Sequence, residues 1–101
     1  MTNDFQIHHQ QRLWQSMIDL IQNYLNGETK DFYGLVGQLE GVLDASDIQD
    51  HALINRWYDF WTPLEIRRAV QGNDVDQRQA IEELSKMKQF LLEVKNNSTN
   101  F

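Results

Sequence analysis

The chain has no cysteine, a single proline and no long apolar run. Without cysteine, disulfides, thiol catalysis and thiolate metal sites are excluded. A membrane-spanning helix needs about 18 apolar residues in a row, and no segment approaches that length. The opening residues, MTNDFQIHHQQRLW, are polar and show no signal-peptide pattern. We therefore expect a cytoplasmic protein that does not enter a membrane.

Sequence signatures of catalysis are also missing. There is no P-loop, GxGxxG, GxSxG or HExxH pattern. His8 and His9 are adjacent, so on a helix their side chains do not share a face, and with Asp4 they make at most a weak metal site. The acids that begin at Asp44 do not form a calcium loop, because Ile48 holds the fifth position and no glycine holds the sixth. We predict a protein that is not an enzyme, with no catalytic residue, metal or cofactor.

What is present is a chain of 101 residues rich in helix formers, with eleven Leu and eleven Gln. This length suits one domain. No stretch alternates apolar and polar residues as a half-buried strand does, whereas apolar residues recur at helical spacing in four segments. We predict an all-α, up-and-down bundle of four main helices over residues 1–95, joined by short loops. Residues 96–101 are predicted to be a disordered polar tail.

Local signals place the ends of three helices. The first ends at about Asn26, followed by the stop residue Gly27. The second, 30–45, has Thr29 as its expected N-cap, and the last covers about 76–95. The apolar stripes are Leu13, Trp14, Met17, Ile18, Leu20, Ile21, Tyr24 and Leu25; Phe32, Leu35, Val36, Leu39, Val42 and Leu43; and Ala80, Ile81, Leu84, Met87, Leu91 and Val94.

The third helix begins near Asp50 and carries the single proline. Thr62-Pro63-Leu64-Glu65 has the residues of a capping box with proline at the first helical position. The apolar residues that follow, Ile66, Ala69 and Val70, lie on a different side of the helical wheel from those before the proline. A helix that continued through the proline would also clash with the carbonyl four residues earlier. We therefore predict a break or sharp kink at Thr62-Pro63.

Charge is distributed unevenly along the chain. Residues 1–65 hold three basic and ten acidic residues, a net of −7, whereas residues 66–101 have a net of +1. Such an acidic region repels nucleic-acid phosphates and attracts a basic protein, although net charge also simply keeps a small protein soluble. We predict a protein partner, and no nucleic acid, for an acidic face that comprises Glu40, Asp44, Asp47, Asp50 and Asp59.

The segment 56–61, with sequence RWYDFW, has the composition of a binding hot spot. The apolar stripe of the third helix comprises Leu53, Ile54, Trp57, Tyr58, Phe60 and Trp61. Trp57 and Trp61 are four residues apart in the middle of this stripe, so we expect both in the core. Tyr58 and Phe60 lie at opposite flanks of that stripe. Both are candidate contact residues, but only one of them can readily be central to a single interface.

Three glycines, Gly34, Gly37 and Gly41, line one face of the second helix, opposite its apolar stripe. Each costs about 0.5–1 kcal/mol relative to alanine. They either provide a smooth face for close packing by another helix, or they are poor helix formers on an exposed face. We expect close packing, with a homodimer as its main form.

The run MIDLIQNYLNG over residues 17–27, followed by an acidic and apolar helix, resembles small helical bacterial immunity proteins of the colicin and contact-dependent-inhibition kind. Trp57, Trp61, Leu64 and Glu65 are similar to a pattern in other small acidic bacterial proteins of this length. The resemblance implies a non-enzymatic binding protein that masks a basic toxin surface. The alternative is a structural, homo-oligomeric helical protein.

Overall fold

The structure is a computed structural model that describes residues 2–46 and 48–97, with side chains described from residue 10 onward. It contains α1 (Thr2–Leu25), α2 (Phe32–Asp44), α3 (His51–Gln71), the short 3-10 helix η1 (Gly72–Asp74) and α4 (Gln77–Asn97). No strand occurs in those two stretches. The prediction of an all-α bundle of four main helices is confirmed.

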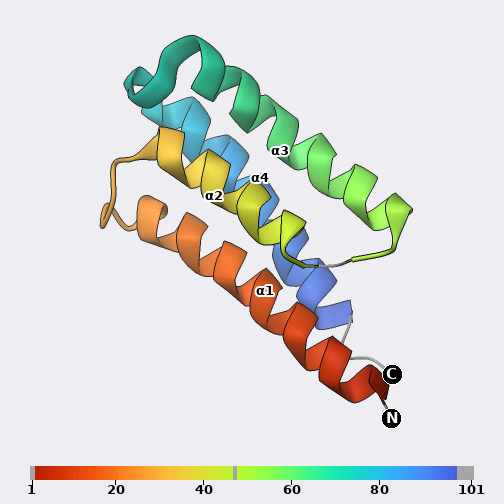
Figure 1. The fold of residues 1–101 in the computed structure, drawn as a ribbon. Coiled ribbons are helices and arrows are strands. Elements are labelled where there is room, and N and C mark those ends of the chain that lie inside the picture. The colour runs from red at the N-terminus through yellow and green to blue at the C-terminus, as the bar shows by residue number, and fades with distance from the viewer. Residues whose placement is uncertain (1, 47, 98–101) are drawn as a thin grey trace.

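Successive helices run in opposite directions, and each packs against two neighbours, so that α1, α2, α3 and α4 form a closed ring (Figure 1). The bundle is elongated, with extents of 47 × 25 × 19 Å. This arrangement follows from the short connections, which allow a helix to return only along its predecessor. It also leaves an outer surface on every helix, where partner contacts would have to lie.

The first connection is closed by a glycine, as the sequence predicts. Gly27 has a φ of 81°, a conformation that costs glycine little. Its N–H donates to the carbonyl of Tyr24 at 3.0 Å, and the N–H of Glu28 donates to that of Asn23 at 2.9 Å. This pair of bonds is a Schellman motif, and it ends α1 at Leu25.

The start of α2 differs from the prediction. Its N-cap is Asp31, not Thr29, and the Asp31 carboxylate accepts a hydrogen bond from the N–H of Gly34 at 2.9 Å. The N–H of Tyr33 is satisfied from elsewhere in the fold, because Asn73 in η1 accepts it at 2.8 Å. A residue forty positions away therefore completes the cap, which no local pattern could indicate.

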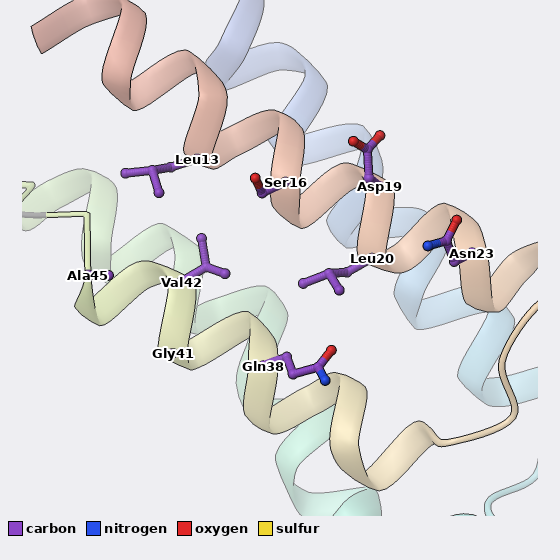
Figure 2. Close-up of a pocket in the computed structure, with 9 residues that line it drawn as sticks. All are labelled: Leu13, Ser16, Asp19, Leu20, Asn23, Gln38, Gly41, Val42 and Ala45. Atoms are coloured by element: carbon purple, nitrogen blue, oxygen red, sulfur yellow. The ribbon is translucent and has the colours of Figure 1, made fainter.

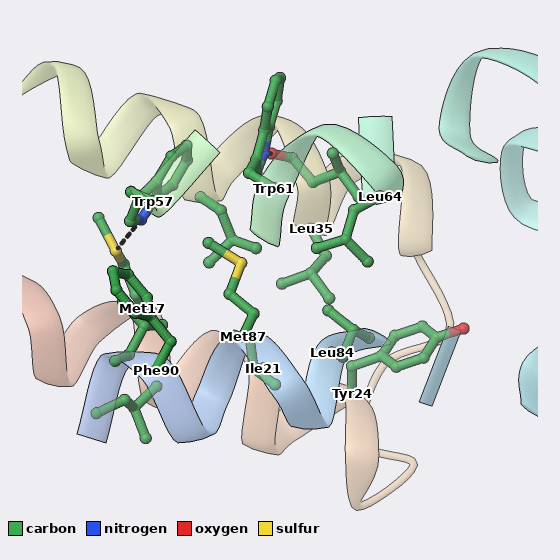
Figure 3. Close-up of a cluster of buried hydrophobic side chains, with 14 of the residues drawn as sticks. Met17, Ile21, Tyr24, Leu35, Trp57, Trp61, Leu64, Leu84, Met87 and Phe90 are labelled. Carbon is green, nitrogen blue, oxygen red and sulfur yellow. Dashed lines mark hydrogen bonds between the residues drawn. The ribbon is translucent and has the colours of Figure 1, made fainter. Parts of the chain in front are cut away.

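The core runs through the middle of the ring (Figure 3). Trp57 is fully buried, as predicted, and its indole N–H donates to the sulfur of Met17 at 3.4 Å. Trp61 stacks on it with ring centroids 5.7 Å apart and donates to the carbonyl of Val36 at 2.9 Å. Leu64 and Phe90 are also buried, although they were not assigned to a stripe. Ile81, in contrast, belongs to the predicted stripe of α4 but is 45% exposed.

Pro63 does not end the third helix. α3 is helical without interruption from His51 to Gln71, so a break at Thr62-Pro63 is wrong, while the alternative of a kink there stays a prediction. Buried side chains lie on both sides of the proline, with Trp57 and Trp61 before it and Leu64 after it. Their packing outweighs the lost hydrogen bond, which costs about 3 kcal/mol in a helix interior. The phase shift remains, because Ile66 and Val70 lie 59% and 77% exposed on the outer face.

The last helix is longer than predicted. It begins after Asp76, whose carboxylate accepts from the N–H of Gln79 at 3.2 Å, and it continues to Asn97. Asn96 and Asn97 are therefore helical, and the predicted disordered tail is wrong for these two residues. The rest of that tail, 98–101, lies outside the described residues.

Candidate functional site

All ion pairs among the described residues join residues of α3 and α4 at position 65 or later. Arg67 pairs with Glu83 at 2.7 Å, Arg68 pairs with Glu65 at 2.9 Å, and an i,i+4 pair joins Lys86 and Glu82 at 3.4 Å. These acids all stand at position 65 or later. Within the described part of the chain, the predicted partner-binding acids form no ion pair; they are Glu40, Asp44, Asp50 and Asp59.

Glu40 and Asp44 lie on α2 beside Tyr58 of α3. The phenol of Tyr58 donates to the Glu40 carboxylate at 3.1 Å. Partial burial raises the pKa of Tyr58 above 10.0, and the hydrogen bond to Glu40 and the charges of Glu40 and Asp44 raise it further. We call these three residues the α2–α3 acidic cluster. The structure therefore brings together two of the predicted acids and one predicted aromatic residue.

The remaining predicted acids are in different positions. Asp50 is the N-cap of α3, and its carboxylate accepts from the N–H of Leu53 at 3.1 Å. This role is structural, although the side chain is exposed. Asp59 is exposed on α3. Asp47 lies outside the described residues.

Phe60 points to the other side of α3 from Tyr58. Its ring stacks on Phe90 of α4 with centroids 4.8 Å apart, and the guanidinium of Arg56 lies 5.2 Å from the centroid of that Phe90 ring. Tyr58 instead contacts Trp57 and Trp61 edge to face. The two residues are thus on opposite flanks, as predicted, and of the two only Tyr58 belongs to the acidic cluster.

The three glycines of α2 do not meet another backbone within the described chain. A Cβ on Gly34 would meet its own N-cap Asp31, and one on Gly37 would lie 2.9 Å from Nη1 of Arg68. A Cβ on Gly41 would have no neighbour within 4 Å. Gly41 therefore has no internal neighbour, and Gly37 faces a side chain of α3, not a helix backbone, while packing of this face by a second copy stays a prediction.

A groove runs between α1 and α2 on the outside of the bundle (Figure 2). Its volume is about 690 Å³, and we call it the α1–α2 groove. Sequence reasoning missed it, because Leu13, Leu20 and Val42 were assigned to the core stripes. The sequence feature that could have indicated the groove is the position of these three residues at the edges of their stripes, because edge positions are half-buried in this structure. The lining residues are Leu13, Ser16, Asp19, Leu20, Asn23, Gln38, Gly41, Val42 and Ala45.

Other kinds of site find no support in the described side chains. No group of three or more His, Asp or Glu residues among them is arranged to hold a metal ion. The predicted weak site at His8, His9 and Asp4 lies outside the described side chains. None of the described helices has both the length and the apolar character needed to cross a bilayer.

Comparison with protein-family models, curated proteins and solved structures returned no match to this chain. The functional argument therefore depends on its own residues.

Proposed function

We propose that the protein is a non-enzymatic binding module that captures a basic protein partner through the acidic residues of α2 and α3. The observation that carries the proposal is the uneven ion pairing. Arg67, Arg68 and Lys86 are paired with acids at positions 65, 82 and 83, whereas Glu40, Asp44 and Asp59 have no basic partner in the described chain. Uncompensated charge of one sign speeds encounter with a partner of the opposite sign.

An immunity-type role is the specific form of this proposal. It would place the α2–α3 acidic cluster against a basic toxin surface, in line with the resemblance of residues 17–27. Tyr58 adds a partly exposed aromatic ring next to the two carboxylates, and tyrosine is enriched among residues that dominate binding energy.

Affinity capture with charge variants tests the proposal. The immobilised protein is incubated with cytosol of the source cells, and retained proteins are identified by mass spectrometry at low and high salt. The test variant combines Glu40→Gln, Asp44→Asn and Asp59→Asn. We expect the native protein to retain a basic protein at low salt and the variant to bind it about tenfold more weakly.

The matched control removes the same number of negative charges from the C-terminal part of the chain, at positions 74, 82 and 93. It combines Asp74→Asn, Glu82→Gln and Glu93→Gln, all of which are exposed. We expect this control to retain the partner like the native protein. Equal binding by the test variant, or retention that does not weaken with salt, would contradict the proposal.

A second candidate function is self-association, and the outer face of α3 favours it. Ile66 and Val70 are one turn apart and largely exposed, and Ala69 beside them is exposed as well. The neighbouring Arg67 and Arg68 are neutralised by Glu83 and Glu65. An apolar and locally neutral ridge can pack against its own copy about a two-fold axis.

Sedimentation equilibrium tests this second function. If the ridge joins two copies, the native protein sediments as a dimer and the variant Ile66→Lys/Val70→Lys as a monomer. Ile81→Lys on α4 is the control, because it changes another exposed isoleucine. A native protein that stays monomeric at high concentration removes the second candidate.

A further inference from the structure

We propose that the α1–α2 groove binds a helical segment of the partner, about three turns long, with apolar residues on one side and Lys or Arg along its flanks. This inference rests on the proposed function and names the part of the partner that is recognised. Helix-in-groove binding needs an apolar floor, room for a backbone and complementary charge at the margins. The groove provides each of these.

The floor is apolar and already fixed by the fold. Leu13 and Leu20 of α1 and Val42 of α2 point into the space between the two helices (Figure 2). Leu20 and Val42 pack against the core on their inner side, so their outer side can be covered without rearrangement. Such half-buried residues gain about 25 cal/mol for each Å² of apolar surface that a partner removes from water.

The α2 side of the groove has small side chains, so another helix can approach it closely. Gly41 has no side chain, and no atom lies within 4 Å of the position that its Cβ would take. Ala45 follows one turn later and contributes only a methyl group to the lining. Small residues let two helix backbones come close, which increases the contact area of a helix that binds here.

The length of the groove sets the length of its occupant. The groove follows α1 from Leu13 to Asn23, which is about 15 Å at the helical rise of 1.5 Å per residue. A second hollow of about 220 Å³ shares Leu20 and Asn23 and continues to Thr29 and Asp31. A helix of about three turns would occupy the main groove, and its next residues would reach the second hollow.

Charge selects a basic occupant over a second copy of this chain. No Lys or Arg lines either hollow, whereas Asp19 and Asp31 do. The carboxylate of Asp19 points away from α2 at the outer margin, where a flanking Lys or Arg would meet it (Figure 2). A second copy would bring a chain with a net charge of −6 against this surface, and like charges oppose that contact.

The test uses designed peptides and the full chain. The probe is a three-turn amphipathic helix made only of Leu and Lys, and the comparison peptide has the same composition, scrambled so that no apolar side remains. Each is titrated into protein with labelled methyl groups. We expect the methyl resonances of Leu13, Leu20 and Val42 to shift with the amphipathic peptide, and the scrambled peptide to bind about tenfold more weakly.

A groove-filling variant with a matched control sharpens the test. Gly41→Arg places bulk and positive charge in the groove at a position with open space, so the fold should tolerate it. Gln89→Arg adds the same charge at an exposed position of α4. We expect Gly41→Arg to weaken binding of the amphipathic peptide at least about tenfold, while Gln89→Arg leaves it within about twofold of the native value.

Three results would overturn the groove proposal and leave the proposed function standing. They are equal binding of both peptides without shifts of the groove methyls, failure of the amphipathic peptide to bind while a basic protein is still captured, and groove shifts that appear with protein concentration alone. The last result would assign the groove to a second copy. If neither the peptides nor any basic protein bind, the proposed function itself fails.

Discussion

Three glycines on one face of α2 have different surroundings and should respond differently to the same substitution. Gly41→Ala adds a methyl group where no atom lies within 4 Å, so we expect the free energy of unfolding to rise by about 1 kcal/mol through better helix propensity. In Gly34→Ala the new Cβ would clash with a carboxylate oxygen of the N-cap Asp31. We expect a loss of about 1 kcal/mol there. Urea denaturation of both variants measures the two signs.

The same pair of variants bears on the predicted homodimer. If Gly41 packed against a second copy, Gly41→Ala would destabilise the protein or release monomer. A fall in the free energy of unfolding for Gly41→Ala would therefore contradict the open surroundings that the structure gives this residue.

Tyr58 makes stability depend on pH in the alkaline range. Its folded pKa lies above 10.0, because burial and the neighbouring acids disfavour the phenolate. The unfolded chain releases this proton first as the pH rises, so folding loses free energy from about pH 10.0 up to the raised folded pKa. We expect Tyr58→Phe to cost about 1 kcal/mol at neutral pH, through the lost bond to Glu40, and to flatten the alkaline loss.

Urea denaturation at neutral pH and above pH 10.0 checks this prediction. Tyr33→Phe is the matched control, because its ring is 53% exposed and the cation–π contact with Arg68 survives in phenylalanine. If both variants lose stability with pH in parallel, the acidic cluster does not act on Tyr58 as the structure indicates.

At the scale of elements, α3 contains a residue, Pro63, that destabilises the helix in which it lies. Pro63 cannot donate to the carbonyl four residues earlier, and that carbonyl belongs to the exposed Asp59, where water can reach it. We expect Pro63→Ala to raise the free energy of unfolding by up to about 3 kcal/mol without a change in helical content. Chemical denaturation and circular dichroism measure these quantities. A less stable variant would mean that packing of the half-buried proline ring outweighs the restored bond.

The start of α2 depends on a contact between elements. Asn73 of η1 accepts the N–H of Tyr33 at 2.8 Å and donates to Asp31 at 3.3 Å. We expect Asn73→Ala to lower the free energy of unfolding by about 1 kcal/mol, the usual value of a helix cap. Amide exchange at Tyr33 should become faster in this variant. Asn55→Ala on the exposed side of α3 is the control and should cost nothing.

At the scale of the molecule, the acidic N-terminal two-thirds should make stability depend on salt. Uncompensated acids repel one another, and added salt screens that repulsion over about 10 Å or less. We expect the melting temperature to rise as salt is added from a low concentration. The ion pair of Arg67 with Glu83 is weakened by salt and acts in the opposite direction. A melting temperature that falls with salt would show that such pairs outweigh the repulsion.

Local sequence alone determined the helices, most of the core and the imbalance of charge. Helical periodicity needs only the spacing of apolar residues, which is why Trp57 and most of the α1 and α2 stripes were assigned to the core correctly. Leu13, Leu20 and Val42, at the edges of those stripes, are exceptions. The stop at Gly27 was also predictable, because left-handed backbone strongly favours glycine.

The tertiary structure decided which local signals prevailed. The packing of Trp57, Trp61 and Leu64 outweighs the capping box at Thr62, and their burial keeps α3 helical through Pro63. The cap at Asn73, the pairing of Arg67 with Glu83 and the groove beside Gly41 each join residues that are far apart in the sequence. Periodicity within one helix carries no information on which neighbour covers a given edge, so only the packed bundle could separate core positions from an open apolar surface.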